Sequence, residues 1–314
     1  MKIIDFEAIT NLGITPDMCY EWVCETISNK KTMLLPPKIS MSDKPGMFCN
    51  VMPCIINENW SGVKIVNRYP ERVPSLDSRL FLIDNATGEF LAIMDANWIT
   101  AMRTGAVAAH SIYHLAKKDF ETIGIIGLGN TCRATLLVLA SLYKDRKFNI
   151  KLYRYKGQET NLIERFKDYP NFEFTIVDTE EEVVRGSDVI VSCVTFLDHD
   201  ICSDDCFSKG VLVVPVHTRG FSNCDLFFDK VFADDYGHVH HFKNFDKFRK
   251  FAEVSDVING TVPGRENDDE RILAYNIGIA AHDINYASHI YNLLKDREDI
   301  PDYDMKNPSD KFWI

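Results

Sequence analysis

Two glycines, Gly127 and Gly129, have the spacing and surroundings that most directly suggest chemistry in this chain. They follow an isoleucine-rich apolar run at 122–126 and precede a run of good helix formers at 133–142. In a strand–turn–helix unit the first glycine allows a tight turn. The second lets the backbone approach a dinucleotide's pyrophosphate, which sits on the helix N-terminus. Cys132 occupies the third glycine position, so we expect the helix to stand slightly further from the strand. We predict a dinucleotide site here, with a structural turn in an ordinary α/β domain as the alternative.

The end of the next predicted strand, 149–154, bears on which dinucleotide binds. Enzymes that favour NAD usually place Asp or Glu there to hold the ribose 2′-hydroxyl. This chain has Tyr153-Arg154-Tyr155-Lys156, with no carboxylate in those four positions. Arg154 and Lys156 suit a 2′-phosphate and favour NADP over NAD, whereas a pair of solvated surface charges is the alternative.

A third feature is Arg103, which lies beside small residues in a predicted helix over 95–116. Because glycine within a helix costs about 1 kcal/mol relative to alanine, Gly105 in this flank calls for a reason. The small flank lets another backbone or a flat ligand come close, and tight helix packing is the alternative. Packing alone does not explain the adjacent arginine.

These residues require a particular scaffold. After the glycine turn, predicted strands alternate with helices, which implies a parallel, doubly wound Rossmann-type sheet covered on both faces. The predicted strands are 122–126, 149–154, 172–177, 188–194, 211–216 and 230–233. A short extended piece at 271–276 and a helix from Gly278 follow, without a further strand–helix unit. We expect that helix to return to the N-terminal part of the chain.

The N-terminal part has a different pattern. Residues 1 to about 35 are predicted to be mainly helical, with Thr15 as N-cap and Pro16 in the first turn. Strands follow at 62–69, 80–83 and 90–94, the last two joined by the turn 84–89. Antiparallel strands before a Rossmann-type unit imply a separate α+β domain. The fold class is therefore α/β, with one domain over 1–112 and 285–314 and a Rossmann domain over 113–284.

Composition excludes several classes of function. The 314 residues are 46% apolar and 26% charged, with a net charge of −11 from 35 basic and 46 acidic side chains. This balance opposes extended contact with nucleic acid or an anionic membrane. The N-terminus lacks the apolar core of a signal peptide, so a cytoplasmic location is expected. The nine cysteines are interpreted as small core residues, and no cysteine or histidine spacing fits a standard zinc pattern, so no metal is predicted.

Several motifs, in this order along the chain, resemble the ornithine cyclodeaminase/μ-crystallin family. They are Val63-Lys64, the turn 84–88, Thr100 before Arg103-Thr104-Gly105-Ala106, the glycine turn, Gly264-Arg265, and Gly278 followed by Asp283. The resemblance extends from about Pro36 to Tyr291. It implies a Rossmann domain and a second domain that dimerises through its strands. Known family activities include ornithine cyclodeamination, alanine dehydrogenation and ketimine reduction.

The resemblance also implies roles for residues. Hydride would move between the nicotinamide and the α-carbon of an amino or imino acid, while Arg103 holds the carboxylate bidentately. Lys64 would exchange a proton with the substrate nitrogen, with desolvation lowering its pKa towards neutrality. The strand pattern alone instead favours a solvent-facing lysine. Cofactor contacts are expected from ten residues: Thr104, Gly127, Gly129, Asn130, Thr131, Arg154, Lys156, Val194, Asn276 and Gly278.

Two departures from the family pattern concern the substrate. Lys38 stands after the proline pair, where family members commonly have arginine as a second carboxylate contact. The loop 217–222 lacks the aspartate of cyclodeaminases, and Arg219 there would favour a substrate with a neutral or acidic side chain.

Three functions remain open at this stage. The first is an NAD(P)-dependent amino-acid dehydrogenase or imine reductase, and the second is ornithine cyclodeaminase, a lyase that uses bound NAD. The third is a non-catalytic nucleotide- or small-ligand-binding protein of the μ-crystallin type. Net consumption of cofactor separates the first two, and retention of Lys64 and Arg103 argues against the third.

Overall fold

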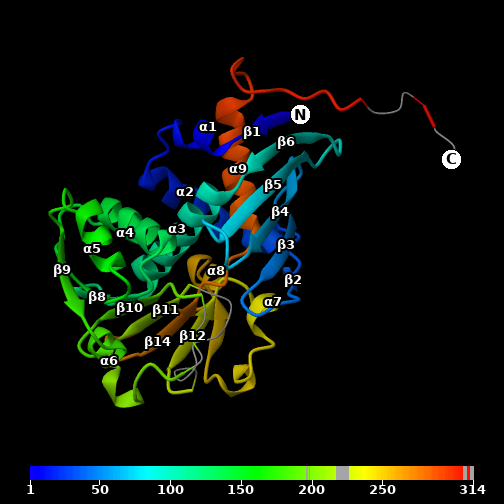
Figure 1. Cartoon of the computed structure of the whole chain (residues 1–314). Helices are drawn as coiled ribbons and strands as arrows, with labels where there is room; N and C mark the ends of the chain where they lie inside the picture. Colours follow the sequence, from blue (N-terminus) through cyan, green and yellow to red (C-terminus); the bar gives the residue numbers. More distant parts are fainter. Residues whose placement is uncertain (196, 198, 217–225, 307–309, 312–314) are drawn as a thin grey trace. The chain divides into compact units, whose positions relative to one another are not determined.

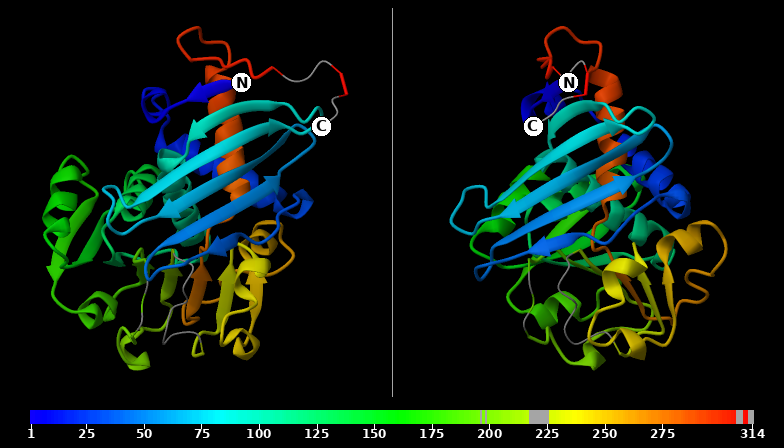
Figure 2. Two further views of the ribbon diagram at one scale, coloured as in Figure 1. Left: turned by 45° about the vertical axis from the view of Figure 1, so that its right-hand side comes forward. Right: turned by 90° about the vertical axis from the view of Figure 1, so that its right-hand side faces the viewer.

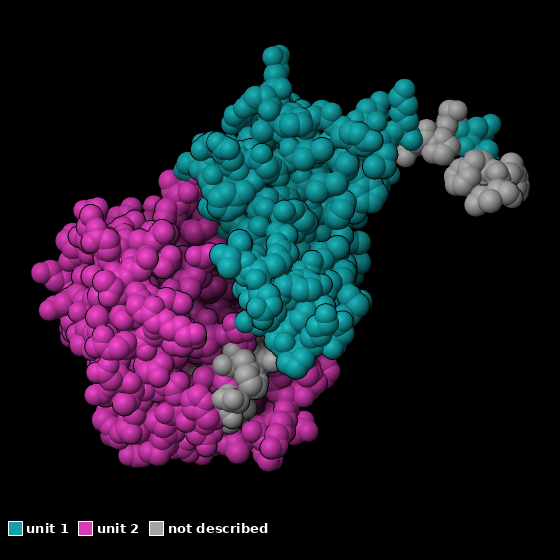
Figure 3. Space-filling view, viewed as in Figure 1, with its two compact units in different colours: residues 1–13, 32–100, 283–314 teal, residues 14–31, 101–282 magenta. Residues whose placement is uncertain are grey.

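The computed structural model describes residues 1–195, 197, 199–216, 226–306 and 310–311 (Figure 1). The chain forms two compact units, coloured separately in Figure 3. Unit 1 contains residues 1–13, 32–100 and 283–314, and unit 2 contains 14–31 and 101–282. The domain boundaries drawn from sequence differ in that 14–31 and 101–112 fall in unit 2 and 283–284 fall in unit 1. Helix α2 (Pro16–Asn29) packs there against α4 (Asn130–Leu142), where Ser141 donates a 2.6 Å hydrogen bond to Asp17.

Unit 1 is built on a six-stranded sheet in the order β1-β6-β5-β4-β3-β2. The strand β1 pairs with β6 in parallel, and the other pairs are antiparallel. The helical prediction for the N-terminus is wrong at β1, because a three-residue strand depends on long-range pairing that its local sequence does not reveal. The bounds are β1 (Lys2–Ile4), α1 (Phe6–Thr10), β2 (Ile39–Met41), β3 (Phe48–Ile55), β4 (Trp60–Arg68), β5 (Leu76–Asp84) and β6 (Phe90–Asp95).

Helix α9 (Ala280–Leu294) covers one face of this sheet, and Figure 2 shows it crossing behind the strands. Alternation along β4 directs Gly62, Lys64 and Val66 to that buried face. A side chain at Gly62 would overlap the Phe81 carbonyl oxygen of β5 and lie 2.7 Å from Ile284 Cδ1 of α9, so the glycine leaves room for both neighbours. The predicted return of the C-terminal helix to the N-terminal part of the chain is confirmed.

The other face of the sheet, here called the outer sheet face, also carries apolar side chains. They are only partly buried and form rows across the strands: Val51, Pro53, Val63, Ile65, Phe81 and Ile93.

Unit 2 contains an eight-stranded parallel sheet in the order β13-β12-β14-β11-β10-β7-β8-β9. From β7 the chain adds β8 and β9 on one side, and β10 and β11 on the other, so the strand order reverses at β7. The predicted doubly wound Rossmann-type sheet is confirmed. The bounds are β7 (Thr122–Ile126), β8 (Phe148–Tyr153), β9 (Phe172–Val177), β10 (Val189–Ser192), β11 (Leu212–Pro215), β12 (Lys230–Ala233), β13 (Phe251–Glu253) and β14 (Ile272–Tyr275).

The strand β14 corrects the sequence analysis, which found no further Rossmann-type unit in that region. It is inserted between β11 and β12, and all four of its residues are buried. Its pairing partners lie far away in the sequence, which is why the local pattern showed only an extended piece.

The helices of unit 2 surround this sheet. Thr15 caps α2 by accepting a hydrogen bond from the Met18 amide, and Pro16 is the first helical residue, as predicted. No described helix has the length and apolar character needed to cross a bilayer. The remaining helices are α3 (Asn97–Leu115), α5 (Gln158–Arg165), α6 (Glu180–Val184), α7 (Tyr236–Val239) and α8 (Val254–Ile258), with short 3-10 turns at Lys30–Thr32, Asp204–Cys206 and Phe245–Lys247.

Candidate functional site

The two motif glycines connect β7 to α4 at the point where the strand order reverses. Gly127 has φ +87°, and a side chain there would lie 2.7 Å from the backbone of Cys193 and Val194. Gly129 is the N-cap of α4, and no described atom lies within 4 Å of where its Cβ would stand. The first glycine therefore lets the segment after β10 come close, and the second leaves the helix N-terminus open to an anion.

Cys132 is fully buried in the first turn of α4. Burial raises the pKa of its thiol to about 12. The side chain in the third glycine position therefore stays neutral near physiological pH and places no negative charge beside a pyrophosphate.

Tight packing explains the small residues next to Arg103. A Cβ on Gly105 of α3 would overlap Ala134 of α4, so the two helices touch at this point. Thr104 is half-buried, whereas Ala106, Ala108 and Ala109 are buried. Helix packing accounts for this flank without a flat ligand.

Arg154 lies beside carboxylates that come from outside the Tyr153–Lys156 stretch. It donates a 2.5 Å hydrogen bond to Asp178, which follows β9, and its guanidinium is 3.9 Å from Glu159 on α5. Lys156 is exposed and has φ 51°. The local positive charge is thus smaller than the sequence suggested, although an exposed ion pair of this kind is weak.

Arg103 is held close to the turn that follows β14. The residue is 5% exposed. A Cβ on Gly278 would lie 2.6 Å from its Nη1 and 3.1 Å from its Nη2, and Gly278 has φ +85°. The Gly278 amide donates a 2.7 Å hydrogen bond to Asp234, at the end of β12. Asp234 therefore fixes the glycine turn against which the guanidinium packs.

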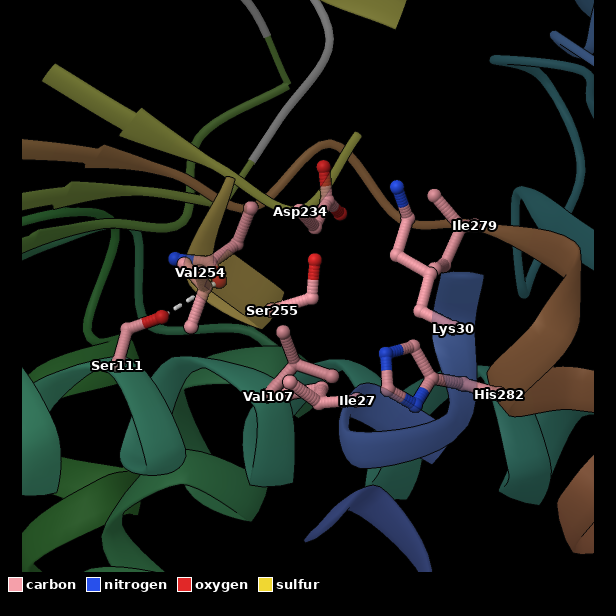
Figure 4. Close-up of a pocket in the computed structure, with 10 residues that line it drawn as sticks. Ile27, Lys30, Val107, Ser111, Asp234, Val254, Ser255, Ile279 and His282 are labelled. Atoms are coloured by element: carbon pink, nitrogen blue, oxygen red, sulfur yellow. Dashed lines mark hydrogen bonds between the residues drawn. The ribbon is translucent and has the colours of Figure 1, made fainter. Parts of the chain in front are cut away.

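Asn276 lines a small cavity at the carboxyl ends of β12 and β14 (Figure 4). The Ser111 hydroxyl donates to its side-chain oxygen at 3.0 Å, and its amide nitrogen donates to the Ala274 carbonyl at 3.1 Å. Lys30 and His282 also line this cavity, whose volume is about 10 Å³. That volume holds roughly one water molecule, so the cavity is too small for a cofactor or substrate.

Lys64 occupies the centre of the unit 1 sheet, between Met52 and Leu80 on the neighbouring strands. It is fully buried, so the solvent-facing alternative is wrong. Its Nζ forms a 2.7 Å ion pair with Asp283, which is also fully buried, and contacts Thr100 Oγ1 at 3.4 Å. Removal from water favours the neutral amine, while Asp283 favours the ammonium.

The other predicted site residues differ in how far they are exposed. Asn130 is exposed, whereas Thr131, Val194 and Lys38 are half-buried. Arg219 lies outside the described residues.

Three residues were not singled out by the sequence analysis as site residues. Asp283 was noted only as part of a motif, and Asp234 gave no local signal. Arg133 is in the first turn of α4, and its buried Nε has no hydrogen-bond partner among the described residues. Its position four residues after a motif glycine was the available signal. No group of three or more His, Cys, Asp or Glu side chains is arranged for a metal ion in the described ranges.

The chain as a whole matches a protein family and shares its fold with solved structures. Residues 15–298 match the model of the Ornithine cyclodeaminase/mu-crystallin family. The chain is 27% identical over 248 residues to N-((2S)-2-amino-2-carboxyethyl)-L-glutamate dehydrogenase of Staphylococcus aureus. The aligned segment is 74% of this chain and 72% of that protein.

Two solved structures share the fold over nearly the whole chain. One is Thermococcus litoralis Δ1-pyrroline-2-carboxylate reductase in complex with NADH and L-proline, with a TM-score of 0.85 and 21% identity, covering 96% of this chain and 100% of that one. The other is an archaeal alanine dehydrogenase dimer with bound NAD, with a TM-score of 0.83 and 22% identity, covering 97% and 99%.

Proposed function

Because this chain belongs to the ornithine cyclodeaminase/mu-crystallin family, we propose that it is an NAD(P)-dependent oxidoreductase acting on an amino or imino acid. The reaction would transfer a hydride at the C–N bond, as in an amino-acid dehydrogenase or an imine or ketimine reductase. The observation that carries the proposal is the buried Lys64–Asp283 pair, because a buried lysine is a suitable group for moving a proton. The names of the dehydrogenase and reductase relatives support this class of reaction.

A bound cofactor would supply the hydride of such a reaction, and this chain supplies the other groups that the reaction needs. Arg103 is proposed to hold the substrate carboxylate, since a planar guanidinium binds both oxygens at once. Lys64 is proposed to give a proton to the nitrogen as the C=N bond is reduced, or to take one in the reverse direction. Lys38 and Arg219 remain proposed substrate contacts.

Residues around the glycine turn are proposed to hold the cofactor. Gly129 leaves the N-terminus of α4 open, and Arg133 has a buried donor that a phosphate oxygen would satisfy. For the ribose, Arg154 and Lys156 support NADP. A 2′-phosphate would have to replace Asp178 at the Arg154 guanidinium.

We also propose a homodimer built on the outer sheet face. Partly exposed apolar rows on a sheet are typical of protein interfaces. The archaeal alanine dehydrogenase, which shares this fold, is a dimer.

A panel assay tests the proposal. The protein is incubated with cyclic imino acids, or with oxo acids and amines, while absorbance of NADH or NADPH is followed. Oxidation of the reduced cofactor by at least one imino acid is expected. Conversion of ornithine to proline and ammonia without net cofactor consumption would instead identify a cyclodeaminase. Tight nucleotide binding with no turnover of any substrate would identify a binding protein.

A further inference from the structure

The Lys64–Asp283 pair is unusual because both side chains are completely removed from solvent. Removing two charges from water costs several kcal/mol for each ion in real proteins. The partners of Lys64 on either side within the sheet, Met52 and Leu80, are apolar and buried, so Asp283 is the counter-charge that its environment provides at 2.7 Å. Such a costly arrangement calls for a functional reason.

Gly62 precedes Lys64 by one pleat on the same face of β4. A side chain there would overlap the Phe81 carbonyl oxygen on β5 and lie 2.7 Å from Ile284 Cδ1 on α9. Asp283 is the residue directly before Ile284, so the missing side chain leaves room for the start of α9 on the face of β4 that carries Lys64.

Several contacts favour the ionised form of both groups. Asp283 is in the first turn of α9, where the helix dipole stabilises a negative charge. Lys64 also donates to the Thr100 hydroxyl at 3.4 Å, and that hydroxyl donates to Ser78 Oγ at 3.3 Å.

We propose that Asp283 is a positioning residue that holds Lys64 in place as an ammonium ion, so that Lys64 enters the reaction as a proton donor. This inference rests on the proposed function. A bound reduced cofactor would supply the hydride to the imine carbon, and the C=N π electrons would move to the nitrogen. Lys64 would give that nitrogen its proton and be left as a neutral amine, which must take up a proton again before the next turnover.

The test is the substitution Asp283→Asn, which removes the negative charge and keeps the shape of the side chain. Loss of the counter-charge makes the ammonium less stable, so the proton donor is lost at lower pH. The limb of the kcat/KM profile that falls with rising pH is expected to move down by about one to three pH units, the usual effect of one nearby opposite charge. Asp283→Glu, which restores the charge, is expected to keep that limb near its wild-type position.

A control uses Lys230 of β12, a buried lysine in unit 2. Lys230 is 4% exposed and lies 2.6 Å from Glu266 and 3.0 Å from Glu270. Glu270→Gln removes a carboxylate from a buried lysine as well, but it should leave the pH profile unchanged. A pH shift of equal size in both variants would show a general effect of lost charge and would overturn the proposal.

A second readout does not require turnover. The ¹³Cε NMR shift of Lys64, assigned by comparison with Lys64→Met, reports the protonation state of its amine. The wild-type signal should stay that of an ammonium through neutral pH, and Asp283→Asn should titrate one to three units lower. Unchanged titration in Asp283→Asn would overturn the inference. If Asp283→Asn does not fold, a wild-type Lys64 signal typical of a neutral amine at pH 7 would overturn it equally.

The two proposals can fail separately. A wild-type protein that oxidises no reduced cofactor with any imino acid would refute the proposed function. The NMR titration would then still decide whether Asp283 holds the ammonium.

Discussion

Replacing Gly278 with alanine is expected to weaken substrate binding through Arg103. The added Cβ would lie 2.6 Å from Arg103 Nη1, whereas carbon and nitrogen atoms in contact normally stand about 3.5–4.0 Å apart. The guanidinium must therefore move by about 1 Å. Arg103 is 5% exposed, so its surroundings do not simply let it swing into solvent. Because a 1 Å misplacement of a positioning group can cost about 10²-fold, we expect KM for the carboxylate substrate to rise about 10- to 100-fold.

The substitution also introduces backbone strain, which a control must separate from the collision. An alanine at φ +85° costs about 1–2 kcal/mol relative to an ordinary backbone conformation. Gly260 has φ +70° with no described atom within 4 Å of its Cβ position, so Gly260→Ala shares the strain without the collision.

The assay combines steady-state kinetics, urea unfolding and direct titration with NADH. Gly278→Ala and Gly260→Ala should lower the free energy of unfolding by similar amounts. Only Gly278→Ala should raise KM for the carboxylate substrate. A Gly278→Ala protein with the KM of Gly260→Ala would refute the placement of Arg103 as the carboxylate contact.

Three further predictions concern catalysis, cofactor and assembly. Lys64→Ala should lower kcat about 10²- to 10⁴-fold and destabilise the fold by about 3–5 kcal/mol, because Asp283 is left buried without its cation; a folded variant retaining more than about a tenth of wild-type kcat would remove Lys64 from the mechanism. Replacing Arg154 and Lys156 together with alanine should weaken NADPH binding by about 1.5–3 kcal/mol per lost contact and NADH binding much less, as measured by fluorescence titration. Equal affinities of the unaltered protein for the two nucleotides would contradict this preference. Ile65→Asp on the outer sheet face should turn a dimer into a monomer in sedimentation at micromolar concentration, whereas a monomeric wild type would contradict the proposed assembly.

The main elements of the fold were predictable because their signals are local. One continuous stretch contains the strand at Thr122–Ile126, the glycine turn and the helix after it. In this stretch the isoleucines favour a strand, the glycines favour a turn and the residues that follow favour a helix. Thr15 and Pro16 likewise specify a helix start without help from the rest of the chain. Strand β1 was predicted to be helical and β14 was predicted only as a short extended piece, because each has only three or four residues and is defined by a distant partner.

The site was predictable in its residue types and less so in its contacts. Alternation along β4 places Lys64 on one face with Val66, but it does not say which face is buried. Burial depends on α9, which lies more than 200 residues away in the sequence and supplies Asp283. Only the family resemblance favoured a desolvated lysine at this position, and no pattern in the local sequence paired it with an aspartate.

Arg154 shows why a charge in the sequence is a weak guide to ligand preference. The stretch from Tyr153 to Lys156 contains two cations and no anion, and its chemistry taken alone suits a 2′-phosphate. In a parallel sheet, however, the ends of neighbouring strands meet at one edge, so Asp178 after β9 reaches the guanidinium that follows β8. The pair is more than half exposed on both sides, at 54% and 70%, and is therefore weak enough for a phosphate dianion to displace. The preference for NADP then depends on how much more strongly Arg154 binds a 2′-phosphate than it binds the Asp178 carboxylate. Replacing Asp178 with asparagine should strengthen NADPH binding without helping NADH, and an equal gain for both nucleotides would show that Arg154 does not contact the 2′-phosphate.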